Sequence, residues 1–432
     1  MFFTMARGRC ALWRGPVLFL MVTAAAAAQV VAEPQGELSL SMAVAAAQAR
    51  NPELAANAYE LSIADARTLQ AGLRPNPQLA LELENFAGSG VASGVGALET
   101  TLTLSRVIEM GRKRELRRDA AGYARELAGV DRQARQLDVL AEVTRRFVEV
   151  VLAQQHDDLA QEAVQLAEQT LAAISARVDA ARSPEAERSR ARIALTRARI
   201  EQQQARSALL GARRSLAATW SSRAAQFSRA SADLYVMPPV ESLEDWVQRM
   251  GASPDFLRFA SESRLRDAEI RLARAQARQD LTAGLGVRHL QASGDVALVA
   301  GFSIGMPWSN SNQGAIREAE LRREQSLASA QAAQLNAEAT VYRIYQELTA
   351  VRWRTETLLQ AAIPQAQGAL EQTRYGYERG RFSYLELASA QQELIGLRAA
   401  AIDAAGDFHL LLSELERLTG RALATDAERN SQ

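Results

Sequence analysis

The chain has 432 residues and a formal net charge of zero, because 50 Lys and Arg balance 50 Asp and Glu. This balance argues against nucleic acid as a partner, since coating a polyanion needs an excess of basic side chains. An aromatic content of only 6%, together with many alanines, is more typical of long helices than of a mixed globular core.

The first residues have the features of a secretory signal peptide. Three arginines precede an apolar stretch over 16–28, and small residues offer cleavage after Ala28 or Ala32. We therefore expect residues 1–28 to be a signal peptide. Cys10, the only cysteine, lies within it, so the exported chain would contain no disulfide. After this segment the sequence has no apolar run of roughly eighteen residues, so no membrane-spanning helix is predicted.

The first predicted helix is opened by Asn51-Pro52-Glu53-Leu54 and has about twenty residues. Two predicted strands follow, over Gln78–Phe86 and Glu99–Arg106, in which leucines alternate with polar or small residues. From Gly111 to about Ala181 nothing interrupts a helical pattern, which predicts a helix of roughly 100 Å.

A turn and a second helix of about 35 residues follow the long helix. They complete a first plan of helix, two strands, long helix and helix. Ser183-Pro184 predicts a serine N-cap with proline at the first helical position. We assign 38–220 to a first repeat and 221–241 to an equatorial linker, irregular from Phe227 to Val240.

The same plan then recurs at an offset of about 202 residues, opened by Ser253-Pro254-Asp255-Phe256. Its predicted strands are Asp280–His289 and Val296–Pro307, and its long helix runs from Gly314 to about Arg379, with a kink expected at Pro364. The predicted second repeat covers 242–420, and a flexible tail covers 421–432.

The last helix begins with a predicted capping box, Ser383 with Glu386, after a turn at Gly380. Its heptad pattern predicts a coiled-coil stripe with two seams. The seams are formed by Leu387, Leu394, Ala401, Phe408 and Leu415, and by Ala390, Leu397, Ala404, Leu411 and Leu418.

Four strands cannot close a barrel in lipid, where each unpaired backbone group at an open edge costs several kcal/mol. If these strands lie in a membrane, several chains must share one barrel, and three chains with four strands each would give twelve.

These features resemble the TolC-like outer-membrane factors over essentially the whole exported chain. The motifs that carry the resemblance are Asn51-Pro52-Glu53-Leu54, Pro75-Asn76-Pro77, Glu109-Met110-Gly111-Arg112-Lys113-Arg114 and Tyr377-Glu378-Arg379-Gly380-Arg381-Phe382-Ser383. Three further segments are similar to the cobalt–zinc–cadmium resistance branch: Leu83-Glu84-Asn85-Phe86, Glu99-Thr100-Thr101-Leu102 and Asn312-Gln313-Gly314-Ala315-Ile316.

The resemblance implies a mainly α fold with a small β part. Long coiled-coil helices would form an α-barrel, and the four strands of each chain would contribute to a shared twelve-stranded β-barrel in a homotrimer. It also implies an outer-membrane location extending into the periplasm, and contacts with outer-membrane lipid. The partners would be a periplasmic adaptor and an inner-membrane, proton-driven RND-type pump. The chain would be the exit duct that passively conducts heavy-metal cations, with no cofactor and no catalysed reaction.

The two hairpin ends are candidate sites for adaptor docking and for the periplasmic entrance. Within the resemblance, Glu386 matches an acidic position that rings the tunnel entrance, although it equally completes the capping box; Phe382 stands where the family often has arginine. The candidate residues are Tyr377, Gly380, Arg381, Phe382, Ser383 and Glu386 at one end, and Arg182, Ser183 and Pro184 at the other. Glu82, Glu84 and Glu99, on the polar faces of the strands, are candidate pore-lining residues.

The sequence predicts neither a metal site nor a catalytic centre. His156-Asp157-Asp158 is better explained as a solvated helix face, because adjacent helical residues point in different directions. We likewise do not interpret His289, which ends a strand, or His409, which lies beside the seam residue Phe408, as metal ligands. No Ser-His-Asp set, phosphate-binding loop or pair of catalytic carboxylates is found.

The sequence leaves other duct functions open and argues against two further classes of protein. A duct for drug efflux or for type I protein secretion would have the same architecture. A periplasmic adaptor would need lipoyl-like β segments between its hairpin arms, and none is found. A coiled-coil scaffold is disfavoured by the signal peptide and by the alternating strands.

Overall fold

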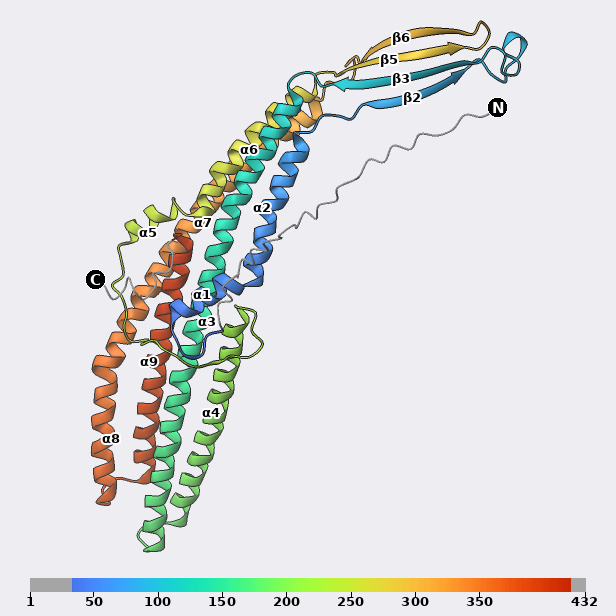
Figure 1. The fold of residues 1–432 in the computed structure, drawn as a ribbon. Helices are drawn as coiled ribbons and strands as arrows, with labels where there is room; N and C mark the ends of the chain where they lie inside the picture. The colour runs from blue at the N-terminus through green and yellow to red at the C-terminus, as the bar shows by residue number, and fades with distance from the viewer. Residues whose placement is uncertain (1–32, 421–432) are drawn as a thin grey trace, which may run out of the picture. The chain divides into compact units, whose positions relative to one another are not determined.

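The computed structural model describes residues 33–420 (Figure 1). The predicted signal peptide and the predicted tail lie outside the described residues. The plan of helix, two strands, long helix and helix is present twice, as predicted. The first copy contains α2 (Pro52–Ala71), β2 (Gln78–Glu84), β3 (Glu99–Ile108), α3 (Lys113–Asp179) and α4 (Glu185–Ala218). The second contains α6 (Pro254–Gln276), β5 (Leu281–Leu290), β6 (Asp295–Ile304), α7 (Gln313–Thr357), α8 (Ile363–Glu378) and α9 (Tyr384–Leu418).

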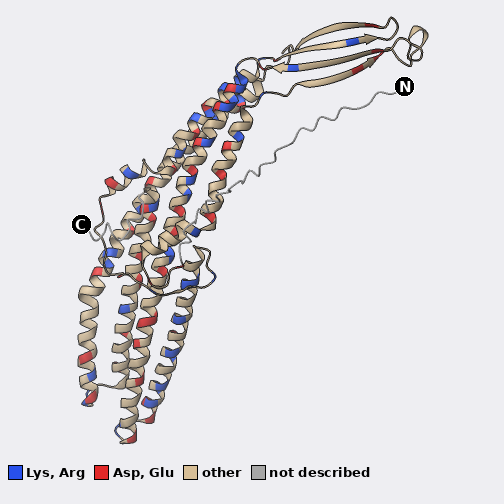
Figure 2. Ribbon diagram, viewed as in Figure 1, with Lys and Arg blue, Asp and Glu red and all other residues tan. Residues whose placement is uncertain are grey.

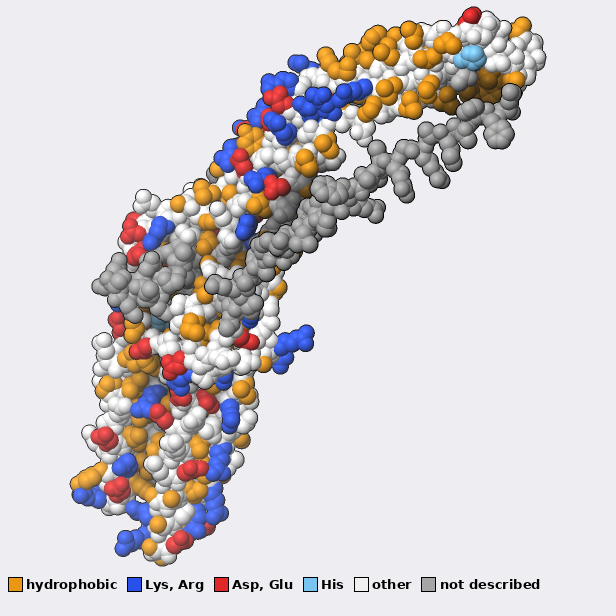
Figure 3. All heavy atoms as spheres, viewed as in Figure 1, with side chains coloured by type: hydrophobic (Ala, Val, Ile, Leu, Met, Phe, Trp, Pro, Cys, Tyr) orange, Lys and Arg blue, Asp and Glu red, His pale blue; other side chains and the backbone are white. Residues whose placement is uncertain are grey.

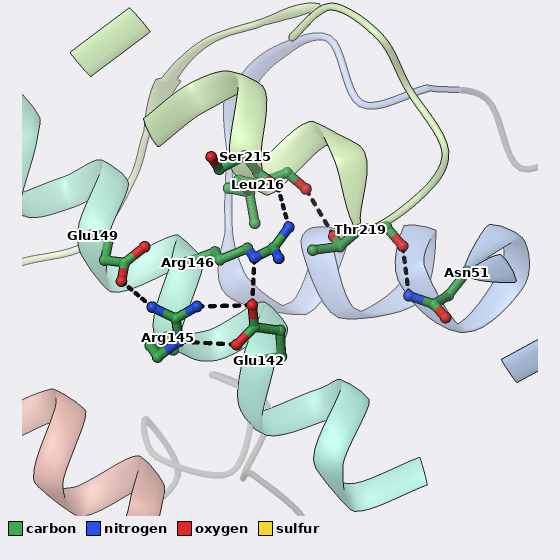
Figure 4. Close-up of polar contacts among 8 residues, drawn as sticks. All are labelled: Asn51, Glu142, Arg145, Arg146, Glu149, Ser215, Leu216 and Thr219. Atoms are coloured by element: carbon green, nitrogen blue, oxygen red, sulfur yellow. Dashed lines mark hydrogen bonds and ion pairs between the residues drawn. The ribbon is translucent and has the colours of Figure 1, made fainter. Parts of the chain in front are cut away.

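Both copies open as their motifs predict. The Asn51 side chain accepts hydrogen bonds from the backbone N–H of Glu53 at 2.9 Å and of Leu54 at 3.0 Å, and Pro52 occupies the first turn of α2. Pro254 has the corresponding place in α6, although the Ser253 side chain makes no capping hydrogen bond. The Asn51 amide also donates to the carbonyl of Thr219 at 2.8 Å, which ties the start of α2 to the end of α4 (Figure 4).

The four predicted strands form one antiparallel sheet in the order β2-β3-β5-β6. Two of the strands end earlier than predicted, and the other ends differ by one or two residues at most. The first strand stops at Glu84, because Asn85 adopts a left-handed conformation with φ of 58°. The last strand stops at Ile304 and does not reach Pro307, because proline has no N–H for a ladder hydrogen bond.

The helix α3 packs along α2, α4, α6 and α9. At its crossing with α9, Gly406 lies directly against Leu152, where a Cβ would come within 2.3 Å of a leucine methyl group. The predicted first seam of α9 is buried along its whole length, with Ala401, Phe408 and Leu415 fully excluded from solvent. Burial of this seam is therefore what holds α9 to the rest of the bundle.

The kink expected at Pro364 takes the form of a π-helical turn, Leu358–Ala362, between α7 and α8. Proline cannot donate to the carbonyl four residues earlier, and the wider turn just before it accommodates that missing hydrogen bond.

Five short elements were not predicted: β1 (Gly36–Leu38), α1 (Leu40–Arg50), the 3-10 turn η1 (Gly90–Ala92), β4 (Phe227–Ala230) and α5 (Leu243–Met250). The prediction that Phe227–Val240 is irregular is therefore wrong for its first four residues. β4 pairs in parallel with β1, and Phe227 is fully buried beside Trp220. Among the described residues, no helix is long and apolar enough to cross a membrane.

Candidate channel surfaces and hairpin ends

One face of the four-stranded sheet is apolar. In the register of the sheet, Leu81 lies opposite Leu102, which lies opposite Val287, which in turn lies opposite Leu298. Opposed residues share a face, so these side chains form an apolar row across all four strands. They are solvent-exposed in the single chain, with Leu298 exposed to 89%. Phe302, which lies on the same face of β6, is exposed to 75%. Figure 3 shows the hydrophobic side chains gathered over the strands, and Figure 2 shows how sparse charges are there.

The opposite face of the sheet is small and polar, and it carries a cluster around Arg288. The guanidinium group donates to Glu84 at 3.0 Å, to Glu99 at 2.8 Å and to the Thr101 hydroxyl at 2.9 Å. Glu84 and Glu99 are opposed in the register, so the arginine bridges two like charges and relieves their repulsion. Glu82 lies on the same face and is exposed. The structure therefore brings the three predicted glutamates to one face.

The two hairpin ends have the same backbone turn. The N–H of Arg182 donates to the carbonyl of Arg177 at 2.8 Å, and the N–H of Arg381 donates to that of Gly376 at 2.8 Å. Each turn places one residue in the left-handed region, and the dihedral φ is 55° at Ala181 and 73° at Gly380. The two tips are thus equivalent in geometry, although only one of them has the glycine that this position favours.

Arg177 joins the two hairpin ends. Its guanidinium carbon lies 4.7 Å from the centroid of the Tyr377 ring, and its Nη1 donates to the carbonyl of Tyr377 at 3.2 Å and to that of Glu378 at 3.3 Å. The Tyr377 hydroxyl is 3.4 Å from a Glu187 carboxylate oxygen. Burial, followed by the negative charge of Glu187, raises the pKa of Tyr377, so the phenol stays a neutral donor.

The predicted capping box at the start of α9 is confirmed. The Ser383 N–H and hydroxyl donate to Oε2 of Glu386 at 2.7 and 2.8 Å, and the N–H of Glu386 donates back to the serine oxygen at 3.4 Å. These hydrogen bonds from Ser383 lower the pKa of Glu386. The other carboxylate oxygen, Oε1, has no hydrogen bond among the described residues, and the side chain is fully exposed.

The predicted cap at the other tip is wrong. Pro184 itself occupies the N-cap position, with an extended φ of −75° and ψ of 150°, and α4 begins at Glu185. The Ser183 side chain makes no capping bond and instead accepts from Nε of Arg177 at 3.4 Å. Glu185 and Glu187 provide negative charge in the first helical turn, which is favourable at a helix N-terminus.

The remaining tip residues are surface residues. Arg182 and Arg381 are exposed and form no ion pair with any described residue. Phe382 is 43% exposed because its ring lies over Gly376. A Cβ on Gly376 would come within 2.1 Å of the ring, so the glycine makes room for the phenylalanine.

An acid-rich groove of about 700 Å³ lies between α3, α7 and α9. Its lining includes Glu142, Glu149, Glu347, Asp407 and Glu414. Burial, followed by the nearby charge of Asp403, raises the pKa of Asp407. Figure 4 shows Arg145 between Glu142 and Glu149, so part of the negative charge is neutralised within α3.

The three histidines have separate environments. Nε2 of His156 on α3 lies 2.8 Å from a carboxylate oxygen of Asp403 on α9. Nε2 of His289 lies 3.3 Å from the side-chain oxygen of Gln291, and Nε2 of His409 lies 2.9 Å from the carbonyl oxygen of Leu234. Asp157 and Asp158 contact Gln161 and Arg229. No group of three or more His, Cys, Asp or Glu side chains in the part of the chain that the structure describes could hold a metal ion.

The comparison with known proteins identifies the family. The family model for outer membrane efflux proteins matches residues 43–222 and 249–421. The chain is 29% identical to the cobalt-zinc-cadmium resistance protein CzcC of Cupriavidus metallidurans over 394 residues, which covers 90% of this chain and 91% of CzcC.

Two solved structures share the fold. A membrane protein from Pseudomonas aeruginosa superposes with a TM-score of 0.76 and 19% identity, covering 88% of this chain and 92% of that one. The outer membrane protein VceC of Vibrio cholerae superposes with a TM-score of 0.73 and 19% identity, covering 88% of this chain and 96% of VceC. The predicted family is confirmed: the chain belongs to the outer membrane efflux proteins.

Proposed function

We propose that the chain is the outer-membrane exit duct of a tripartite system that exports divalent heavy-metal cations. The main observation in favour of a duct is the open sheet with one apolar face. This sheet is joined to hairpins whose two ends have the same backbone turn. The resemblance to CzcC along 90% of the chain supports heavy metals as the substrate class. The duct conducts passively and catalyses no reaction.

The proposed assembly is a trimer. β2 and β6 are the outer strands of the sheet, and each has one edge without a partner strand among the described residues. Such edges are not tolerated in lipid, where water cannot satisfy the free N–H and C=O groups. Pairing β2 of one copy with β6 of the next removes every edge, and three copies then form a closed sheet of twelve strands.

The proposed adaptor-docking surface is formed by the two tips. Arg381 and Arg182 are exposed there, and Arg177 holds the two tips side by side. A cysteine at Arg381 leaves the Ser383 cap intact and should cross-link to the adaptor in intact cells. A cysteine at the exposed Ser309, beyond β6, is the matched control. Cross-linking from Ser309 alone would contradict the orientation.

The proposed entrance filter is a ring of Glu386 carboxylates, one from each chain. The cap occupies Oε2 only, which leaves Oε1 available to a cation. In planar bilayers the wild type should be cation-selective and partly blocked by divalent ions added on the tip side. Glu386→Gln should lose much of both properties while the trimer still forms. Unchanged block and selectivity would assign Glu386 to helix capping alone.

The substrate class is tested in cells that lack the gene. Complementation with the wild type should restore growth in cobalt, zinc or cadmium salts but not in the presence of hydrophobic drugs. Restored drug resistance, or restored secretion of a protein, without metal resistance would favour the alternative duct functions. A chain without its signal segment is the control, because it should stay inside the cell and restore neither.

A further inference from the structure

We propose that five arginines at the junction of strands and helices bind the phosphate groups of anionic membrane lipids and set the depth of the sheet in the membrane. We call them the arginine collar: Arg74, Arg106, Arg114, Arg118 and Arg278. The proposal rests on the proposed function, because it takes the apolar face of the sheet to contact lipid. Figure 3 shows basic side chains gathered where the sheet meets the helices.

Arg106 places the collar at the lipid boundary. It lies opposite Ala283 in the register and shares the apolar face with Leu104 and Ile108. It is exposed, and it is the one basic residue on that face of β3, two residues before the strand ends. A charged side chain at the end of an apolar band is stable when its stem lies along hydrocarbon and its guanidinium group reaches the polar layer.

The other four arginines come from the helix side of the same junction. Arg118 on α3 packs over Gly72, the residue that ends α2, and Arg74 lies two residues after Gly72 in the sequence. Arg278 lies over Gly111, where a Cβ would come within 2.7 Å of its Cδ. Arg114 is in the first turn of α3. Loops and helix ends that are distant in sequence thus bring these charges to one level of the fold.

The collar arginines form no ion pair among the described residues, although the charge of Glu115 acts on Arg114 and Arg118. Three acidic side chains of the junction are already paired, Glu109 with Arg117, Glu115 with Arg112, and Asp280 with Lys113. The five collar arginines are exposed and form no ion pair with any residue from 33 to 420. Like charges held together without paired counter-charges repel one another, and bound anions relieve that repulsion.

An exposed tryptophan indicates that these anions are lipid phosphates. Trp308 follows β6 at the same end of the sheet and is 87% exposed, with Met306 beside it 68% exposed. Tryptophan favours the boundary between hydrocarbon and headgroups, because its ring is apolar and its N–H is polar. Guanidinium groups bind phosphate oxygens in a bidentate manner, which a lysine ammonium cannot do. At the other end of the strands Glu84, Glu99 and Asp295 outnumber the single arginine, Arg288, so the basic cluster is confined to the helix end.

The test compares lipid binding by three full-length proteins in detergent, measured by native mass spectrometry at low salt. The collar variant carries Arg106→Gln, Arg114→Gln and Arg118→Gln. The matched control carries Arg192→Gln, Arg197→Gln and Arg206→Gln, three exposed arginines of α4 that also form no ion pair with described residues. The probes are dioleoylphosphatidylglycerol, dioleoylphosphatidylcholine and inorganic phosphate.

Wild type and control should bind phosphatidylglycerol at least about tenfold more tightly than phosphatidylcholine, and the collar variant should lose most of that preference. The proposal is overturned by equal binding of the two lipids to the wild type, or by an unchanged preference in the collar variant. It is also overturned if inorganic phosphate displaces the lipid at equal concentration, because the site would then bind free phosphate. Reconstitution of the wild type into lipid vesicles tests the proposed function separately, because a wild type that does not insert into the vesicles would contradict the duct itself.

Discussion

The guanidinium group of Arg177, near the end of α3, stacks on the ring of Tyr377 near the end of α8 and donates to its carbonyl at 3.2 Å. This contact joins residues two hundred positions apart, one from each repeat. Arg177 also donates to the carbonyl of Glu378 and so satisfies an orphan carbonyl at the end of α8, whereas the Tyr377 carbonyl also accepts the N–H of Gly380 at 3.0 Å. The tie therefore caps one helix and connects the two hairpins.

Arg177→Ala should loosen the connection between the tips. We expect it to cost roughly 1–3 kcal/mol locally, because two charge-assisted hydrogen bonds and a cation–π contact are lost. Hydrogen exchange over 376–384 should accelerate markedly. Arg182→Ala, at an exposed arginine in the neighbouring turn, is the control and should leave exchange unchanged. Equal effects from both variants would contradict the assigned role.

Ala181→Gly should stabilise the first tip. Ala181 has a φ of 55°, which strains any residue with a Cβ, while its counterpart in the second repeat is Gly380 with a φ of 73°. We expect a gain of about 0.5–1 kcal/mol in the free energy of unfolding, measured from thermal or denaturant unfolding. Ala180→Gly, one residue earlier and at a φ of −84°, should give no gain. A gain from both variants would exclude backbone strain as the cause.

Gly376→Ala should displace the Phe382 ring and destabilise the second tip by roughly 1–3 kcal/mol, since the added methyl group would overlap the ring. Phe382→Ala should remove that conflict. In a double-mutant cycle the alanine at 376 should therefore cost much less when 382 is also alanine. Strictly additive costs would show that the two residues are not in contact.

The stabilisation from Glu386 should depend on pH. Hydrogen bonds from Ser383 lower the folded-state pKa below its ordinary value of 4.5, so the contribution is fully present above that value and is lost as the pH falls through the lowered pKa. Glu386→Gln cannot titrate. The difference in Tm between wild type and Glu386→Gln should accordingly shrink as the pH is lowered. A difference that stays constant down to acidic pH would contradict the carboxylate's role in the capping box.

Local sequence patterns were sufficient to predict the elements that have one apolar face. The alternation of Leu79, Leu81 and Leu83 predicted β2, and the heptads from Leu387 to Leu415 predicted the buried seam of α9. β1 and β4 were missed because strands of three and four residues carry almost no periodic signal. Their pairing is also parallel and distant in sequence, which no local pattern records.

Contacts between the repeats could not be predicted. Arg177 meets Tyr377 only because α3 and α8 end at the same level of the folded chain, and nothing in the sequence around either residue indicates the other. Arg288 had a weak signal, as a lone charge on the small-residue face of β5, but its glutamate partners depend on the register of the strands. Pro184 was misplaced by one position, since serine-proline at a helix start fits two cap alignments.

The central claim is that three copies of this chain form one membrane-spanning duct. It is tested most directly by purifying the exported protein from outer membranes in mild detergent, determining its mass by native mass spectrometry, and recording currents after reconstitution in a planar bilayer. The proposed function predicts a trimer that gives discrete channel openings, because pairing between copies would satisfy the free edges of β2 and β6. A monomer recovered in the soluble fraction that gives no channel current would contradict it.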